Sequence, residues 1–217
     1  MIRYNISFSY PKCRLFENLQ FEYESGQVIS LCGHNGAGKT TLLKILAGIL
    51  PLEDGKFIKP PAKCWLLPST GGLIGGLSLA AHLELTKTVG GGKLPGITEQ
   101  AIQLLETERF MNTPVDSLSS GQYAKAAIII MLANFPQLLL LDEPFAFLDP
   151  KASNRVCTLL KSLEEVTIIF SSHDLHRVES FADRCQIIKE GAILWDSASN
   201  GNNVDLDILQ VAYDENS

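Results

Sequence analysis

The sequence of 217 residues lacks any apolar run long enough to cross a membrane. Its longest unbroken run, residues 126–133, has eight residues, whereas a transmembrane helix needs about 20. Residues 1–11 have neither an apolar core nor a small-residue cleavage site, so we expect no secretory signal. These absences predict a cytoplasmic chain that does not itself span a membrane.

Cysteine is sparse, and its spacing argues against two common uses. The chain has five cysteines, an odd number, and none of them forms a C-x-x-C pair. A disulfide framework or a zinc site is therefore not expected, and reduced, mostly buried thiols are. The five are Cys13, Cys32, Cys64, Cys157 and Cys185.

Basic residues are absent beyond Lys189, whereas five acidic residues lie between Asp196 and Glu215. The net charge of -6 is thus concentrated at the C-terminal end, and the body of the chain is nearly neutral. Proteins that bind DNA or RNA normally carry a basic patch or stripe. We therefore expect no nucleic-acid partner.

The order of the predicted elements indicates an α/β fold. Residues 5–10 and 16–23 alternate apolar and polar side chains, which predicts a small N-terminal antiparallel sheet. Residues 28–32 form a short apolar run typical of a strand buried on both faces, and a helical pattern runs from Lys39 to Pro51. Strands separated by helices imply a parallel sheet. Further buried strands are expected at residues 138–141, 166–170 and 185–188.

Helical patterns at residues 77–88 and 97–110 predict a helical insert between two parts of this sheet. We expect one domain over the whole chain, without internal repeats. Its predicted parts are a core over residues 1–70 and 136–200, a helical subdomain over 71–135, and an acidic surface tail over 201–217 with one or two helical turns.

A phosphate-binding pattern lies between the predicted strand and helix. Residues 33–40 have the sequence G-H-N-G-A-G-K-T, which matches the G-x-x-x-x-G-K-T loop. Its glycines allow close backbone approach to phosphate oxygens, Lys39 supplies a full charge to the β and γ phosphates, and Thr40 can ligate Mg²⁺. The alternative is a plain glycine-rich turn. The expected nucleotide-binding residues are Gly33, Asn35, Gly36, Ala37, Gly38, Lys39, Thr40 and Thr41.

Two carboxylates follow the predicted strand at residues 138–141. A buried strand that ends in an acid places that acid at the sheet edge, where Asp142 would hold Mg²⁺ directly or through water. Glu143 would then orient and polarise the attacking water as a general base. The alternative for this pair is a helix N-cap followed by a solvated acid.

Between these motifs lies Leu118-Ser119-Ser120-Gly121-Gln122, followed by a helical pattern. With this run the sequence resembles ATP-binding cassette (ABC) ATPases, whose signature is LSGGQ and whose other markers recur here in order across nearly the whole chain. The resemblance implies a P-loop NTPase with a RecA-like core. It also implies that Asp149 belongs to a D-loop, that His173 is a switch histidine acting in catalysis with Glu143 and Lys39, and that Tyr10 stacks on adenine.

The same resemblance implies a dimer with two ATP molecules at its interface. The signature residues Ser119, Ser120, Gly121 and Gln122 of one subunit would close over the γ-phosphate held by the other. The helix start expected there is itself suited to binding an anion. The second subunit would be an identical or a different ABC ATPase.

Two residues depart from the family pattern. Ser69 stands where the family has a glutamine that contacts Mg²⁺ and lines the groove for the membrane partner, so a metal contact by Ser69 would need water or a closer backbone. Ser120 replaces the first glycine of the signature, which is tolerable unless that position needs a positive φ.

By this resemblance the chain is a Mg²⁺-dependent ATPase that energises an ABC transporter, bound to separate transmembrane permease subunits at the inner face of the cell membrane. The run from Asp142 to Phe145 is also similar to haem-export ATPase subunits of cytochrome c maturation. One alternative is a soluble ABC ATPase acting on ribosomes, in repair or in iron-sulfur assembly. Another is a P-loop kinase or GTPase, although the N-K-x-D motif of GTPases is absent.

Overall fold

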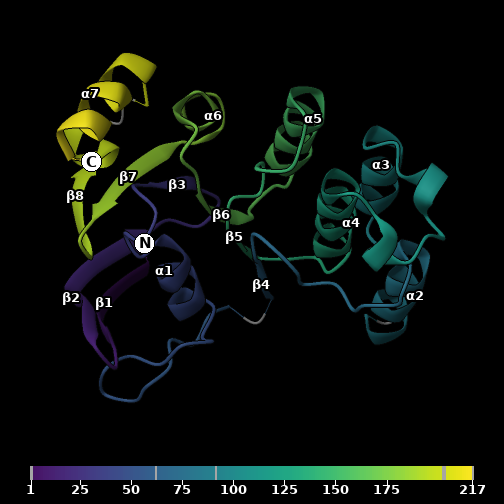
Figure 1. The fold of residues 1–217 in the computed structure, drawn as a ribbon, viewed down its shortest axis with the longest axis horizontal. Helices are drawn as coiled ribbons and strands as arrows, with labels where there is room; N and C mark the ends of the chain where they lie inside the picture. The colour runs from purple at the N-terminus through teal and green to yellow at the C-terminus, as the bar shows by residue number, and fades with distance from the viewer. Residues whose placement is uncertain (1, 62, 91, 202–203, 217) are drawn as a thin grey trace. The chain divides into compact units, whose positions relative to one another are not determined.

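A six-stranded sheet with the strand order β4-β5-β6-β3-β7-β8 organises the computed structural model (Figure 1). Strand β3 is parallel to both β6 and β7, and β5 is parallel to β6, whereas β8 runs antiparallel to β7. The prediction of an α/β fold with parallel strands is confirmed. The strands are β3 (Val28–Cys32), β4 (Cys64–Leu67), β5 (Leu138–Leu141), β6 (Thr167–Ser171), β7 (Arg184–Lys189) and β8 (Ala192–Asp196). The structure describes residues 2–61, 63–90, 92–201 and 204–216.

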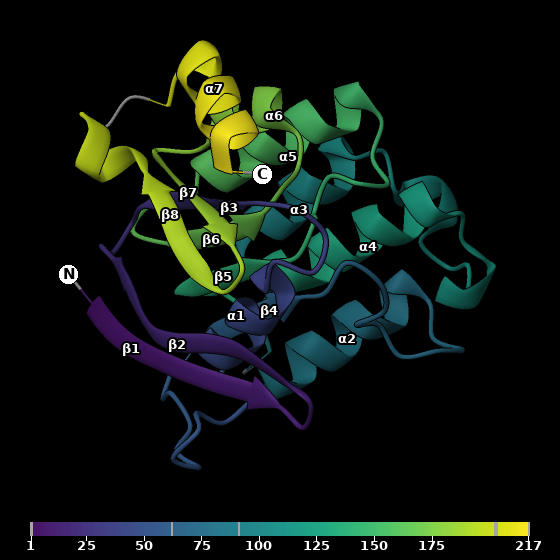
Figure 2. The same ribbon diagram turned by 60° about the vertical axis from the view of Figure 1, so that its left-hand side comes forward.

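The N-terminal strands β1 (Ile2–Tyr10) and β2 (Cys13–Tyr23) form the predicted antiparallel sheet (Figure 2). Their inward-facing side chains join those of helix α1 (Lys39–Leu46) in one apolar core, which also includes residues of β3, β5, β6 and β7. The largest of these buried side chains are Phe16, Phe21 and Tyr23. This core fixes α1, and therefore the loop before it, against the sheet.

Strand β5 consists of four consecutive leucines, and all four are buried. Such a strand is covered on both faces, as parallel strands usually are. Because β3, β5 and β6 are parallel, their carboxyl ends meet at one edge of the sheet, where ligands bind in open α/β folds. This edge carries Gly33, Asp142 and Ser172, the residues that directly follow the three strands.

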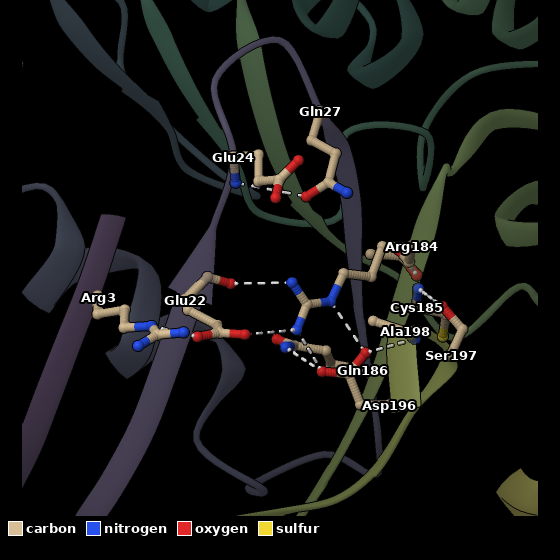
Figure 3. Close-up of polar contacts among 11 residues, drawn as sticks. Arg3, Glu22, Glu24, Gln27, Arg184, Cys185, Gln186, Asp196, Ser197 and Ala198 are labelled. Atoms are coloured by element: carbon tan, nitrogen blue, oxygen red, sulfur yellow. Dashed lines mark hydrogen bonds and ion pairs between the residues drawn. The ribbon is translucent and has the colours of Figure 1, made fainter. Parts of the chain in front are cut away.

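The antiparallel edge strand β8 was not predicted from the sequence. A network of polar contacts holds it to β7 and β2 (Figure 3). Arg184 donates to both carboxylate oxygens of Asp196, at 2.9 and 2.6 Å, and its guanidinium lies 3.8 Å from Glu22. Gln186 donates to the same Asp196 at 2.8 Å. A sequence pattern does not reveal such a long-range pairing.

The chain divides into two compact units. The first comprises residues 1–66, 137–143 and 165–217, and the second comprises 67–136 and 144–164. In the second, the residues of α4 from Ala126 to Leu132 are all buried, as expected for a helix surrounded by others. Its α-helices are α2 (Leu79–Val89), α3 (Gly96–Leu104), α4 (Ser120–Leu132) and α5 (Pro150–Lys161).

Two helix predictions need correction. The helix expected at residues 97–110 ends at Leu104, because Glu106 has a φ of 57° and a 3₁₀ turn follows at Glu108–Phe110. The one or two helical turns expected in the tail are part of a longer helix, the eleven-residue α7 (Leu206–Asn216), which packs on β7, β8 and α6 (Leu175–Phe181). Residues 202, 203 and 217 of that tail lie outside the described residues. Among the described helices, none is both long and apolar enough to span a membrane.

Candidate nucleotide-binding and hydrolysis site

The loop between β3 and α1 needs glycine at two crowded positions. Gly33 has a φ of 143°, and a Cβ there would collide with the carbonyl oxygen of Ile188. Gly38 has a φ of 105°, and a Cβ there would lie 2.8 Å from the ring of Phe16. Side chains are thus excluded from the back of the loop, while a Cβ at Gly36 would meet open space. The backbone N–H groups at the start of α1 remain available to an anion, as in known phosphate sites.

Lys39, the first residue of α1, is buried, with 7% of its surface exposed. Its ammonium group donates to the carbonyl oxygens of Gly33 at 2.6 Å and His34 at 2.9 Å. Burial lowers the pKa of Lys39, and the nearby carboxylates of Glu143 and Asp142 oppose this shift. The loop thus encloses a cation that is suited to a polyanionic ligand.

Thr40 and Asp142 already lie next to each other. The threonine hydroxyl is 3.0 and 2.9 Å from the two carboxylate oxygens of Asp142, which is buried with 6% of its surface exposed. Mg²⁺ typically takes one or two carboxylates, a hydroxyl, phosphate oxygens and waters rather than an all-protein cage. The donor set therefore fits Mg²⁺.

Ser171, to which the sequence analysis gave no role, connects the two carboxylate residues. Its hydroxyl, at the end of β6, donates to Asp142 Oδ1 at 2.8 Å and accepts from the backbone N–H of Glu143 at 2.9 Å. Ser171 is fully buried. The sequence shows a hydroxyl directly after the apolar run at residues 166–170, but only the structure shows that this strand lies beside β5.

Glu143 and His173 form the next contact in this row. Glu143 has a φ of 50°, a left-handed conformation that is uncommon for a non-glycine residue. Its carboxylate lies 3.0 Å from His173 Nδ1, and the imidazole is 67% exposed. Asp142 is buried and no helix begins at Glu143. Asp142 and Glu143 are therefore not a helix N-cap followed by a solvated acid, which was the alternative interpretation.

Tyr10 lies beside the helix that follows the loop. Its hydroxyl is 3.1 Å from that of Thr41, and its ring packs edge-on against Phe8 with the centroids 4.9 Å apart. The side chain is 45% exposed, which leaves ring surface for a ligand. Its role in stacking on adenine stays a prediction.

The signature residues lie at the start of α4, in the second unit. Ser119 accepts from the N–H of Gln122, whose side chain in turn accepts from the N–H of Ser119, and this reciprocal pair is a capping box. A Cβ at Gly121 would lie 3.0 Å from the carbonyl oxygen of Phe147, so glycine allows close approach there. Ser120 is exposed and helical, and a serine is accommodated without strain.

Asp149 caps the next helix, α5, by accepting from the N–H of Ala152 at 2.9 Å. This hydrogen bond lowers the pKa of Asp149. The cap accounts for an aspartate at this position, and the D-loop role of Asp149 stays a prediction.

Ser69 also lies in the second unit, ahead of a glycine-rich loop that side chains hold in place. The backbone N–H of Leu73 donates to the hydroxyl of Tyr123 at 3.0 Å, and that of Ile74 donates to Nε2 of His82 at 2.8 Å. Tyr123 belongs to α4, so the loop after Ser69 is tied to the signature helix. The metal contact of Ser69 stays a prediction.

Fold and site together define a P-loop nucleotide-binding protein. Residues 16–146 match the family model described as ABC transporter. An uncharacterized ABC transporter ATP-binding protein of Methanocaldococcus jannaschii, MJ1023, is 30% identical over 192 residues, covering 86% of this chain and 73% of that protein. The chain belongs to the ABC transporter family, of which it is an ATP-hydrolysing, nucleotide-binding member.

Solved structures agree on the fold. An ATP-binding subunit of an ABC transporter superposes with a TM-score of 0.82 at 24% identity, covering 97% of each chain. The ATP-binding cassette MJ0796, in a dimeric post-hydrolysis state with ADP and Pi, superposes with a TM-score of 0.76 at 23% identity, covering 89% of this chain and 96% of that one. Some other curated relatives are longer, and the chain spans 37% and 40% of the length of two of them.

Proposed function

We propose that this chain binds Mg²⁺ and ATP at the edge formed by the glycine loop and the ends of β5 and β6, and that Glu143 is the general base for hydrolysis. The observation that carries the assignment is the unbroken row of contacts from Thr40 through Asp142, Ser171 and Glu143 to His173. Lys39 lies within electrostatic range of both carboxylates. Such a row can hold a metal, position a base and sense a phosphate.

Lys39 and the residues of this row have separate proposed tasks. Lys39 and the N–H groups at the start of α1 would hold the β and γ phosphates. Thr40 and Asp142 would hold Mg²⁺, which when bound neutralises charge on the phosphate oxygens. Glu143 would accept a proton from the attacking water, and His173, 3.0 Å from that carboxylate, would keep it oriented.

The test compares two glutamates that share the same unusual backbone conformation. Glu143→Gln removes the base but keeps the shape, so we expect ATP binding to persist while hydrolysis falls at least about 100-fold. Glu190 also has a positive φ, of 49°, and it is exposed, so Glu190→Gln is a matched control with wild-type turnover. Near wild-type hydrolysis in Glu143→Gln would refute the assignment.

We also propose that two copies, or this chain and a related ATPase subunit, work together as a dimer. In α4 the capping box occupies the N–H groups of Ser119 and Gln122, whereas those of Ser120 and Gly121 have no partner within the helix. Those two groups could bind the γ-phosphate held by another subunit. Light scattering of Glu143→Gln with ATP should show a doubled mass, and a mass that stays that of the monomer would count against the dimer.

The proposed partners are separate transmembrane permease subunits, and the proposed location is the inner face of the cell membrane. Both proposals rest on family membership. The segment of Ser69, tied to the signature helix through Leu73 and Tyr123, is the proposed link between the docked permease and the site. No feature of the described elements favours the alternative of a soluble ABC ATPase in a non-transport process, and the similarity to haem-export subunits stays a prediction.

A further inference from the structure

The C-terminal helix brings an aromatic side chain onto the phosphate-binding loop. The rings of Tyr213, in α7, and His34, the second residue of the loop, have centroids 5.6 Å apart and planes inclined at 55°. This geometry is typical of a direct contact between two aromatic rings. Neither side chain has a task in the hydrolysis site described above.

Buried side chains and a hydrogen bond to α6 anchor helix α7, which fixes the position of Tyr213. Leu209 and Ala212 are 0% and 5% exposed, and Leu206 donates its N–H to Glu179 of α6 at 3.2 Å. The positions 209, 212 and 213 share one face of a helix. That face is the one α7 turns toward the sheet, and Figure 2 shows α7 lying over β7 and β8.

The backbone carbonyl of His34 accepts two hydrogen bonds that shape the loop. Its carbonyl oxygen accepts from the ammonium group of Lys39 at 2.9 Å and from the N–H of Ala37 at 3.2 Å. The same residue therefore closes the turn of the loop and holds the lysine. A ring packed on its side chain limits the movement of this carbonyl.

The electrostatic surroundings place Tyr213 near the hydrolysis site as well. Burial raises the pKa of Tyr213, and the nearby Cys32 and the carboxylates of Glu143 and Asp214 raise it further. The phenol therefore stays protonated and lies within electrostatic range of Glu143.

We propose that Tyr213 is a positioning residue of the nucleotide site, which acts through His34, so that the C-terminal helix sets how tightly the loop holds ATP. This inference rests on the proposed assignment of the loop as the nucleotide site. The ring contact keeps His34, and with it Lys39, in one arrangement. Without it the loop samples other arrangements, which weakens binding but leaves Asp142 and Glu143 in place.

The test is a double-mutant cycle in the full chain, with Tyr213→Ala, His34→Ala and the combined variant. Each single variant should raise the Kd for Mg-ATP about 2- to 10-fold, the range given by one aromatic pair. The combined variant should bind about as weakly as the weaker single variant, because both remove the same contact. The kcat should stay within about twofold, with the loss confined to KM.

Two controls separate positioning from general stability. Tyr213→Phe keeps the ring and should bind ATP like the wild type. Val211→Ala alters a side chain of the same helix that is 57% exposed and should leave the affinity unchanged.

Additive losses in the cycle, or an equal loss in Val211→Ala, would overturn the proposal. If Tyr213→Ala fails to fold, His34→Ala still decides the matter, because His34 is exposed, and an unchanged affinity in that variant would refute the contact's role. A wild-type chain that does not bind ATP would instead refute the proposed function.

Discussion

Removing the hydroxyl of Ser171 should separate ATP binding from hydrolysis. Ser171→Ala deletes a hydrogen bond to the charged Asp142 and leaves the N–H of Glu143 without its acceptor. A hydrogen bond to a charged group contributes about 1.5–3 kcal/mol. If the transition state loses that much stabilising free energy, kcat falls roughly 10- to 150-fold. Because Lys39 and the loop are untouched, the affinity for nucleotide should change little.

The neighbouring serine provides a matched control for this assay. Ser172 is also buried, but its hydroxyl accepts only the N–H of Asp174 among the contacts described. Steady-state ATPase assays, with calorimetry for affinity, should show a loss of kcat in Ser171→Ala, little loss in Ser172→Ala, and recovery in Ser171→Thr, which keeps the hydroxyl. Equal kcat values for the two alanine variants would refute the idea that Ser171 positions Asp142 and Glu143.

Three further predictions concern charge and thiol chemistry. Lys39→Ala should weaken ATP binding at least about tenfold, because it removes the only ammonium group of the loop, and calorimetry would measure the change. Burial raises the pKa of Asp196, but hydrogen bonds from Arg184 and Gln186 outweigh it and lower the pKa overall. Asp196 therefore stabilises the fold above the unfolded-state pKa of about 3.9, and this stability is lost as the pH falls through the lower folded value; urea unfolding between pH 3 and pH 7, compared with Asp196→Asn, would check it. Cys13 is exposed, whereas Cys32 is buried and its pKa is raised by the contact with the Cys185 thiol and by burial. A thiol reagent at about pH 8 should therefore label Cys13 in the native chain and Cys32 only after unfolding, and mass spectrometry would show which cysteines are labelled.

The sequence alone was sufficient for the elements whose patterns are local. The strand at residues 28–32 was predicted with its observed bounds, and the four leucines of β5 were also recognised, because continuous apolar runs between turn residues have few other uses. The glycine loop was equally clear, since its spacing reflects how a backbone surrounds a phosphate. For these two strands and this loop, the residue types and their spacing were enough to predict the structure.

Other features arise only when distant segments meet. Strand β8 depends on the pairing of Arg184 with Asp196 and Glu22, and the last helix depends on a surface formed by β7, β8 and α6. A charged, polar C-terminal segment carries little information about such a surface. The acidic composition therefore suggested a surface tail with one or two helical turns, where the structure has an eleven-residue packed helix.

The residues of the site also fall into two groups, those that local sequence patterns reveal and those that only long-range contacts reveal. The sequence by itself predicted which residues have the chemistry to bind a nucleotide, because Lys39, Thr40, Asp142 and Glu143 belong to motifs with fixed local spacing. Only the tertiary structure decided which residues orient them. Ser171 reaches Asp142 because β5 and β6 are parallel neighbours, and Tyr213 reaches the loop because its helix folds back over the sheet. These contacts join residues that are 29 and 179 positions apart, and no local pattern encodes such distances.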